Sequence, residues 1–226
     1  MTSTHPPDLA ARAVQIPAGG ELLHGDLELP AQDAPLVLFA HGSGSSRHSS
    51  RNRMVAQRLH RAGIGTLLFD LLTEREALVD ARTRKYRFDI DLLAQRMVDA
   101  SAWAAAREDA DPVPQGFFGA STGSAAALVA AARLGARVQA VVSRGGRPDL
   151  AGGALTLVTA ATLLIVGGQD HGVLALNEQA FEHLHGVGQL VLVPGATHLF
   201  EEPGALEQVA DLAAQWFASH LMRPAR

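Results

Sequence analysis

The segment GFFGASTGSAAALVAAARLG, residues 116–135, joins an apolar run to a long alanine-rich stretch. Between the two lies the pentapeptide Gly-Ala-Ser-Thr-Gly, residues 119–123. This order predicts a buried strand, a sharp turn and a helix. Glycines on either side let the strand and the helix approach closely, and a serine held on such a turn is exposed. We therefore interpret Ser121 as a candidate nucleophile, at the positive end of the helix that follows.

Short apolar runs alternate with amphipathic segments along most of the chain. This alternation predicts an α/β fold, with a mostly parallel central sheet covered by helices on both faces. We expect a single domain over residues 1–226, with a loose N-terminal segment at 1–12. The segment 73–88 is charged and shows no clear core face. The predicted strands are 21–30, 35–42, 64–72, 113–121, 138–146, 161–170 and 188–196, and the predicted helices are 54–63, 89–108, 122–135, 174–185 and 204–222.

The composition is that of a globular protein, with 47% hydrophobic residues, 19% charged residues and a formal net charge of −4. This mild charge gives no reason to expect a nucleic-acid or membrane partner. The sequence contains no cysteine, which excludes disulfides and thiolate chemistry. No signal peptide and no apolar run of membrane-spanning length is visible, so we expect a cytoplasmic protein. The oligomeric state is left open between monomer and homodimer.

Two phosphate-binding motifs do not explain the glycine-rich turn. A Walker loop needs a lysine after its second glycine, and the only lysine in the chain is Lys85. A dinucleotide fingerprint is also absent, because GSGSSR at 42–47 begins like one but ends in Arg47. A tight turn carrying a capping serine is the structural alternative to a nucleophile.

A serine hydroxyl needs a base, and polar residues that follow the predicted strands are the candidates. His198 follows the last predicted strand and could take the proton from Ser121. Asp170 follows the strand before it and could orient the imidazole of His198. Asp149 is the rival acid. The chain order nucleophile, acid, base is thus Ser121, Asp170, His198.

Acyl transfer also needs two hydrogen-bond donors for the oxyanion. We expect the backbone N–H of Thr122 and that of Ser43, in the loop after an early strand, with Gly44 as the second choice for that loop. Gly44, Arg47 and Arg144 are candidate substrate contacts, because arginines at this edge of a sheet can bind a carboxylate or phosphate. Structural ion pairs are the alternative role for both arginines. We expect no metal and no cofactor.

These residues together resemble the α/β-hydrolase superfamily and, within it, the serine hydrolases related to dienelactone hydrolases. The resemblance covers about residues 20–220 and rests on LFAHGSGSS, FFGASTGSAAAL, LLIVGGQD and PGATHLFEEPG. It implies the superfamily order of the triad and no large cap domain, with only the segment 71–89 to cover the site. Dienelactone hydrolases proper use a cysteine nucleophile, whereas this chain has Ser121, which favours ordinary ester chemistry.

The expected activity is that of a serine hydrolase that cleaves a small-molecule carboxylic ester through an acyl-enzyme intermediate. Thioesters, lactones and amides remain possible substrates, and transfer to an acceptor other than water remains a possible reaction. A non-catalytic binding module on the same fold is the alternative from a different class.

Overall fold

The structure is a computed structural model, and it describes residues 11–107 and 113–222. Its centre is a sheet of eight strands in the order β1-β2-β4-β3-β5-β6-β7-β8. Strands β3 to β8 are parallel to one another, and β1 and β2 form an antiparallel pair at one edge. The strands are β1 Arg12–Ala18, β2 Glu21–Glu28, β3 Leu36–Ala40, β4 Gly65–Phe69, β5 Gln115–Ala120, β6 Val138–Arg144, β7 Ala161–Gly167 and β8 Gly188–Val193.

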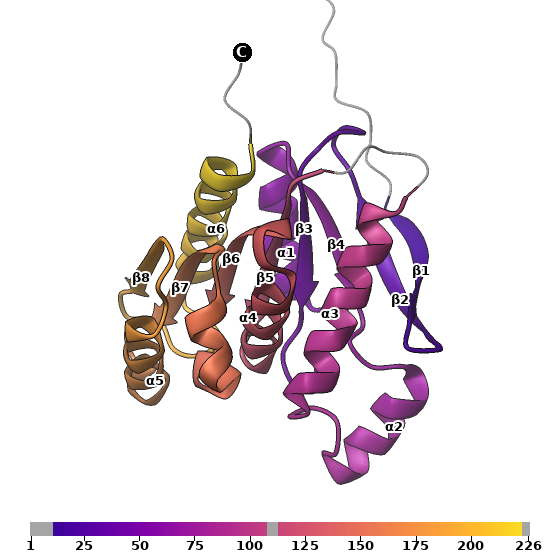
Figure 1. The fold of residues 1–226 in the computed structure, drawn as a ribbon. Coiled ribbons are helices and arrows are strands. Elements are labelled where there is room, and N and C mark those ends of the chain that lie inside the picture. The colour runs from indigo at the N-terminus through magenta and orange to yellow at the C-terminus, as the bar shows by residue number, and fades with distance from the viewer. Residues whose placement is uncertain (1–10, 108–112, 223–226) are drawn as a thin grey trace, which may run out of the picture.

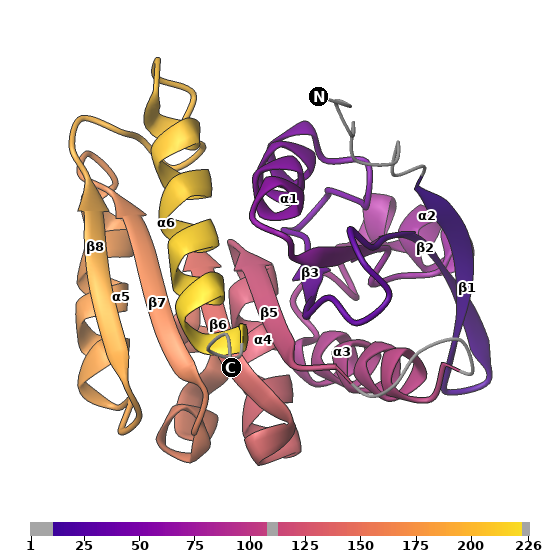
Figure 2. The same ribbon diagram turned by 90° about the horizontal axis from the view of Figure 1, so that it is seen from above.

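Helices cover both faces of the sheet, as Figure 2 shows from above. One face packs on α1 and α6 through a core that includes Phe118, Val142 and Phe217. The opposite face packs on α3, α4 and α5 through a core that includes Phe117 and Leu128. The central strands β3, β4 and β5 are buried along their whole length, which explains their continuous apolar sequence. The helices are α1 Ser50–Arg61, α2 Glu74–Thr83, α3 Ile90–Ala105, α4 Thr122–Leu134, α5 His171–Glu182 and α6 Ala205–Leu221.

The predicted α/β architecture is confirmed, and no large cap domain is present among the described residues. Each predicted strand and helix corresponds to one of these elements. In residues 11–107 and 113–222, no helix combines the length and hydrophobicity needed to cross a bilayer.

Besides a short 3₁₀ turn at Gly135–Arg137, three elements were not predicted. Strand β1 begins at Arg12, so the end of the expected loose segment 1–12 is ordered, and residues 1–10 lie outside the described part of the chain. The charged segment 73–88 contains the helix α2, which projects beyond the two helical layers in Figure 1. Residues Pro148–Leu157 form 3₁₀ turns with a break at Gly152.

Candidate active site

Ser121 occupies the turn between β5 and α4 in a backbone conformation that is rare for a residue with a side chain. Its φ is 52° and its ψ is −124°. The N–H of Ser121 donates to the carbonyl of Arg144 at 3.2 Å, and its carbonyl accepts from the N–H groups of Ser124 at 3.0 Å and Arg147 at 3.1 Å. Strain of this kind persists only where the surroundings hold it, and these hydrogen bonds do so from two neighbouring segments.

The two glycines of the pentapeptide are required by close approach of the backbone. A Cβ atom on Gly119 would lie 2.5 Å from the Cα of Ser124 in the first turn of α4. A Cβ on Gly123 would overlap the carbonyl oxygen of Ala40, at the end of β3. The turn is therefore packed against both its own helix and the neighbouring strand, as the sequence motif predicts.

His198 and Asp170 meet at the same edge of the sheet, in the loops that follow β8 and β7. The distance from His198 Nδ1 to Asp170 Oδ2 is 2.6 Å. Asp170 precedes the first residue of α5, yet its side chain makes no capping bond and points to the histidine instead. Exposed fractions are 39% for the His198 side chain and 17% for that of Asp170. The imidazole is therefore open to solvent on one side and held by a carboxylate on the other.

His198 lies next to the end of β6, and the end of β6 is hydrogen-bonded to the turn that carries Ser121. A Cβ on Gly145 would be 3.6 Å from Cε1 of His198. The carbonyl of Arg144, the residue before Gly145, accepts the hydrogen bond from the N–H of Ser121. Within the described residues, no hydrogen bond joins Ser121 Oγ to His198. Catalytic hydrogen bonds are often long before substrate binds, so this geometry does not count against the pair.

Asp149, the rival acid, is engaged elsewhere. Its two carboxylate oxygens accept hydrogen bonds from Nε and Nη2 of Arg147 at 2.8 and 2.7 Å. This bidentate pair satisfies the carboxylate locally. Of the two acids, it is Asp170 that contacts His198.

The loop after β3 lies directly against the serine turn. A Cβ on Gly42 would be 3.3 Å from the Cβ of Ser121, and Gly44 has a positive φ of 70°. The hydroxyls of Ser43 and Thr122 are 2.8 Å apart. The structure thus brings together the two segments whose N–H groups were predicted to face the oxyanion.

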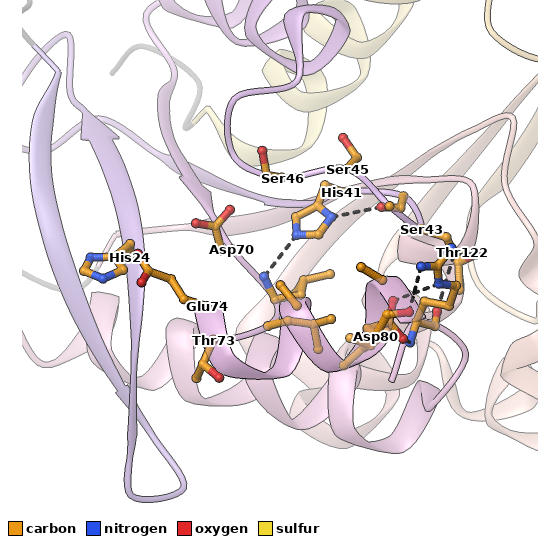
Figure 3. Close-up of a pocket in the computed structure, with 18 residues that line it drawn as sticks. His24, His41, Ser43, Ser45, Ser46, Asp70, Thr73, Glu74, Asp80 and Thr122 are labelled. Atoms are coloured by element: carbon orange, nitrogen blue, oxygen red, sulfur yellow. Dashed lines mark hydrogen bonds and ion pairs between the residues drawn. The ribbon is translucent and has the colours of Figure 1, made fainter. Parts of the chain in front are cut away.

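His41 orders this loop, a role that the sequence pattern did not predict. Its Nδ1 lies 3.0 Å from the carbonyl of Gly42, and its Nε2 lies 3.1 Å from the N–H of Leu71 (Figure 3). The neutral tautomer with a proton on Nδ1 satisfies both contacts. Burial lowers the pKa of His41, and its contact with Gly42 and the charge of Asp70 only partly oppose that effect.

A cavity of about 280 Å³ lies between this loop and α2. Thr122, which follows Ser121 in the chain, and Ser43 lie side by side at one end of it, as Figure 3 shows. Most of the remaining lining is apolar and comes from the segment that precedes and forms α2, and from α3. The resemblance implied that the segment 71–89 covers the site, and this segment does supply part of the cavity wall; its apolar contribution was not predicted, because the segment is rich in charged residues. The apolar lining residues are Leu71, Leu72, Ala77, Ala81 and Leu93.

Helix α2 is fixed at both ends, so the cavity has a defined wall. Thr73 and Glu76 form a capping box at its N-terminus. Near its C-terminus the buried Asp80 accepts hydrogen bonds from the N–H groups of Tyr86 and Arg87 and from the guanidinium of Arg87. Burial alone would raise the pKa of Asp80, but these hydrogen bonds and the charge of Arg87 hold it below its usual value.

The two arginines that were candidate substrate contacts differ in their surroundings. Arg47 is committed to a structural role, because its side chain forms ion pairs with Asp70 and Asp26 and its N–H donates to Asp70 at 2.8 Å. Arg144 is only 7% exposed, and no carboxylate of the described residues pairs with it. Gly44 lines the cavity. No group of three His, Asp or Glu residues that could hold a metal occurs in the described ranges.

A parallel sheet with its polar side chains at the carboxyl ends of the strands, and a serine on a strained strand-to-helix turn, defines an α/β-hydrolase. A solved dienelactone hydrolase from Anabaena variabilis is 55% identical to this chain, with a TM-score of 0.93. That match covers 96% of this chain and 100% of the solved one. The chain belongs to the dienelactone hydrolase family, although no family model matches its sequence.

Other relatives are similar over less of their length or at lower identity. Proteins from two strains of Mycobacterium tuberculosis are 56% identical over 218 residues and carry the provisional name phosphoribosyl transferase. The chain spans about half the length of these curated relatives, at 48%. A dienelactone hydrolase-like promiscuous phosphotriesterase from metagenomic libraries has a TM-score of 0.75 at 19% identity, covering 95% of this chain and 99% of its own. This last likeness concerns the fold alone.

Proposed function

We propose that the protein is a serine hydrolase that cleaves a carboxylic ester. The observation that carries this proposal is the 2.6 Å contact between His198 and Asp170 at the edge of the sheet where Ser121 sits in its strained turn. A binding protein has no need of a nucleophile, a base and an acid in this chain order. Membership of the dienelactone hydrolase family supports the same activity.

In the proposed mechanism, Ser121 Oγ attacks the ester carbonyl carbon while His198 Nε2 takes the hydroxyl proton. Asp170 accepts a hydrogen bond from the Nδ1–H of His198, which keeps Nε2 free as the base and stabilises the imidazolium that forms. The C–O bond of the ester then breaks, and His198 gives its proton to the leaving alcohol. His198 then deprotonates a water molecule, which attacks the carbonyl carbon of the acyl-enzyme. The bond from that carbon to Ser121 Oγ breaks, the acid is released, and His198 returns the proton to Ser121.

The oxyanion of each tetrahedral intermediate is proposed to bind the backbone N–H groups of Thr122 and Ser43. Thr122 is the first residue of α4, whose positive end favours the developing charge. The hydrogen bond from His41 to the carbonyl of Gly42 fixes the peptide that precedes Ser43. This contact supports a loop ordered before substrate arrives, which electrostatic stabilisation of this kind requires.

The cavity beside Thr122 is the proposed site for an apolar group of the substrate. Its volume of about 280 Å³ is at the small end for ligand pockets, and its lining is mostly apolar. Such a site suits a short or medium acyl chain. Thioesters, lactones and amides remain alternatives, as does transfer to an acceptor other than water, because all of these reactions use the same groups.

The name of the mycobacterial relatives suggests phosphoribosyl transfer as a second candidate. About half of their length lies outside the match, whereas the solved dienelactone hydrolase is covered completely. We therefore assign the hydrolase activity to this chain and leave the transferase name with the longer proteins.

The test combines turnover and labelling. The chain should hydrolyse p-nitrophenyl esters and react with a fluorophosphonate probe, and Ser121→Ala should abolish both, with circular dichroism showing an unchanged fold. Retained turnover in Ser121→Ala would remove Ser121 from the mechanism. Absence of both turnover and labelling in the unmodified chain would favour a binding module.

A further inference from the structure

Asn177 brings a polar side chain into the interior, between α5 and the segment that follows β6. The residue is 0% exposed. Its amide nitrogen Nδ2 donates two hydrogen bonds, to the carbonyl of Gly146 at 2.9 Å and to that of Val173 at 2.8 Å. Its Oδ1 is buried with no hydrogen-bond partner among the described residues. An unpaired buried acceptor destabilises a fold, and a leucine at this position would avoid it. The amide therefore calls for a role beyond packing.

The carbonyl of Gly146 belongs to a peptide that supports the nucleophile. The N–H of the same peptide is that of Arg147, and it donates to the carbonyl of Ser121 at 3.1 Å. The peptide is trans, so its C=O and its N–H point in opposite directions. Asn177 and Ser121 are thus bound at its two ends. The other donor to the Ser121 carbonyl, the N–H of Ser124, lies within α4, so Arg147 supplies the contact from outside that helix.

The same relation repeats in the peptide after Ser121. The carbonyl of Ser121 shares this peptide with the N–H of Thr122, which is the N–H proposed to bind the oxyanion. Thr122 is the first residue of α4, so its N–H has no acceptor within the helix. A chain of hydrogen bonds therefore runs from Asn177 through two peptides to the oxyanion. Its links, in order, are Asn177 Nδ2–H to Gly146 C=O, Arg147 N–H to Ser121 C=O, and Thr122 N–H to the substrate.

Such a chain acts on the N–H of Thr122 in two ways. Each hydrogen bond polarises the next peptide, by roughly 10–30% per bond, which makes the last N–H a stronger donor. Each bond also fixes the plane of a peptide, and the plane after Ser121 determines where the N–H of Thr122 points. Ser121 needs this support, because its φ of 52° and ψ of −124° are strained. Burial of Asn177 and Gly146 strengthens the hydrogen bond between them.

Helix α5 also connects this chain to the acid of the site. It begins directly after Asp170, whose carboxylate contacts His198 at 2.6 Å. Asn177 lies seven residues further on, which is about two helical turns. One helix therefore carries the amide that supports the serine turn and follows the acid that orients the base.

We propose that Asn177 is a positioning residue for the oxyanion donor Thr122, and that it acts through the two peptides described above. Asn177 itself does not touch substrate. The inference rests on the proposed function and deepens one part of it, because a donor that is oriented and polarised before substrate binds stabilises the oxyanion without reorganisation. The sequence gives no sign of this role, since Asn177 lies inside a predicted helix and does not follow a strand.

The first test follows the amide protons of Asn177 in the unmodified chain. The sequence contains two asparagines, Asn52 and Asn177, so ¹⁵N labelling of asparagine side chains gives two pairs of amide signals. The spectrum of Asn52→Leu assigns the pairs. Ethyl trifluoromethyl ketone is then added as the probe. Ser121 Oγ forms a bond to its carbonyl carbon, the carbonyl π electrons become the charge of the oxyanion, and the hydroxyl proton passes to His198, as in the first step of ester cleavage.

Formation of the adduct should shift downfield the Asn177 proton that is bound to Gly146, because the oxyanion polarises the whole chain. The proton bound to Val173 lies outside the chain and is the internal control, and nuclear Overhauser contacts tell the two protons apart. An adduct with no shift, or with equal shifts of both protons, overturns the role of Asn177 alone. Absence of an adduct from the ¹⁹F spectrum overturns the proposed function and this inference with it.

Turnover gives a second readout that separates positioning from packing. Asn177→Leu keeps the size of the side chain but removes the donor, so kcat should fall about tenfold while KM changes by less than about twofold. Asn52→Leu is the matched control, because Asn52 is also a buried asparagine with an unpartnered Oδ1, in the first turn of α1. Its kcat should not change.

Two kinetic results would contradict the inference: an effect of Asn177→Leu on KM alone, and an equal loss of kcat in both variants. Circular dichroism checks that each variant is folded. If Asn177→Leu does not fold, the shift of the amide proton in the unmodified chain decides the matter.

Discussion

At the level of single residues, substitutions of Asp170 and Asp149 test whether Asp170 orients the imidazole of His198. Asp170→Asn keeps the shape of the side chain but favours the wrong tautomer of the histidine, so kcat should fall by about two to four orders of magnitude. Ester hydrolysis measured at saturating substrate checks this.

Asp149→Asn is the natural control for that experiment. Its carboxylate is satisfied by Arg147 and does not contact His198, so kcat should change by less than about tenfold. If Asp149→Asn proved as damaging as Asp170→Asn, the assignment of Asp170 would lose its support.

Single residues of the site were predicted from sequence because their backbone positions follow from the fold. Ser121, Asp170 and His198 each come directly after a recognisable strand, and parallel strands bring such positions to one edge. For Arg47 the sequence left two roles open, a substrate contact or a structural ion pair with an acid such as Asp70. Whether an arginine at the edge meets Asp26 and Asp70 or faces substrate depends on side-chain packing, which a strand pattern does not contain.

At the scale of the element, α2 is the part of the molecule that shapes the cavity. Ala77 and Ala81 are one helical turn apart on its exposed surface, and both line the cavity. Ala77→Phe and Ala81→Phe should fill part of the volume. The preferred p-nitrophenyl ester should then have a shorter chain, with kcat/KM for the longest chain reduced at least about tenfold.

The same helix supplies the control. Leu78 is 70% exposed and does not line the cavity, so Leu78→Phe should leave the chain-length profile unchanged. A profile that stays the same in Ala77→Phe and Ala81→Phe would mean that the acyl group binds elsewhere.

Elements with a strong apolar pattern were predicted, and those without one were not. In α2 the only buried residue is Asp80, so no apolar face marks the helix, although its Thr-x-x-Glu capping box at 73–76 was a readable signal. Strand β1 contains Pro17, which is tolerated because β1 lies at the edge of the sheet. The 3₁₀ turns at 148–157 contain two adjacent glycines, which break any helical period.

At the scale of the whole molecule, the sheet order explains why the site could be located but not fully described. Alternation of strands and helices predicts parallel strands and a common functional edge. It does not predict which strands are neighbours, and therefore not that the cavity beside β3 and the end of β6 lie on opposite sides of the turn after β5. That arrangement depends on β5 lying between β3 and β6.

The stability of the whole fold should depend on pH through two histidines that are neutral when folded. Burial lowers the pKa of His41 and of His60, despite the opposing charges of Asp70 and Glu28. As pH falls through about 6.5, the unfolded chain takes up protons that the folded chain does not, so stability decreases toward the lower folded pKa values. The slope is at most about 1.4 kcal/mol per pH unit for each histidine. Thermal unfolding from pH 7.5 to 5.5 should show Tm falling, with a flatter slope in His41→Gln and in His60→Gln. A Tm that holds constant or rises over this range would show that neither histidine is buried as a neutral group.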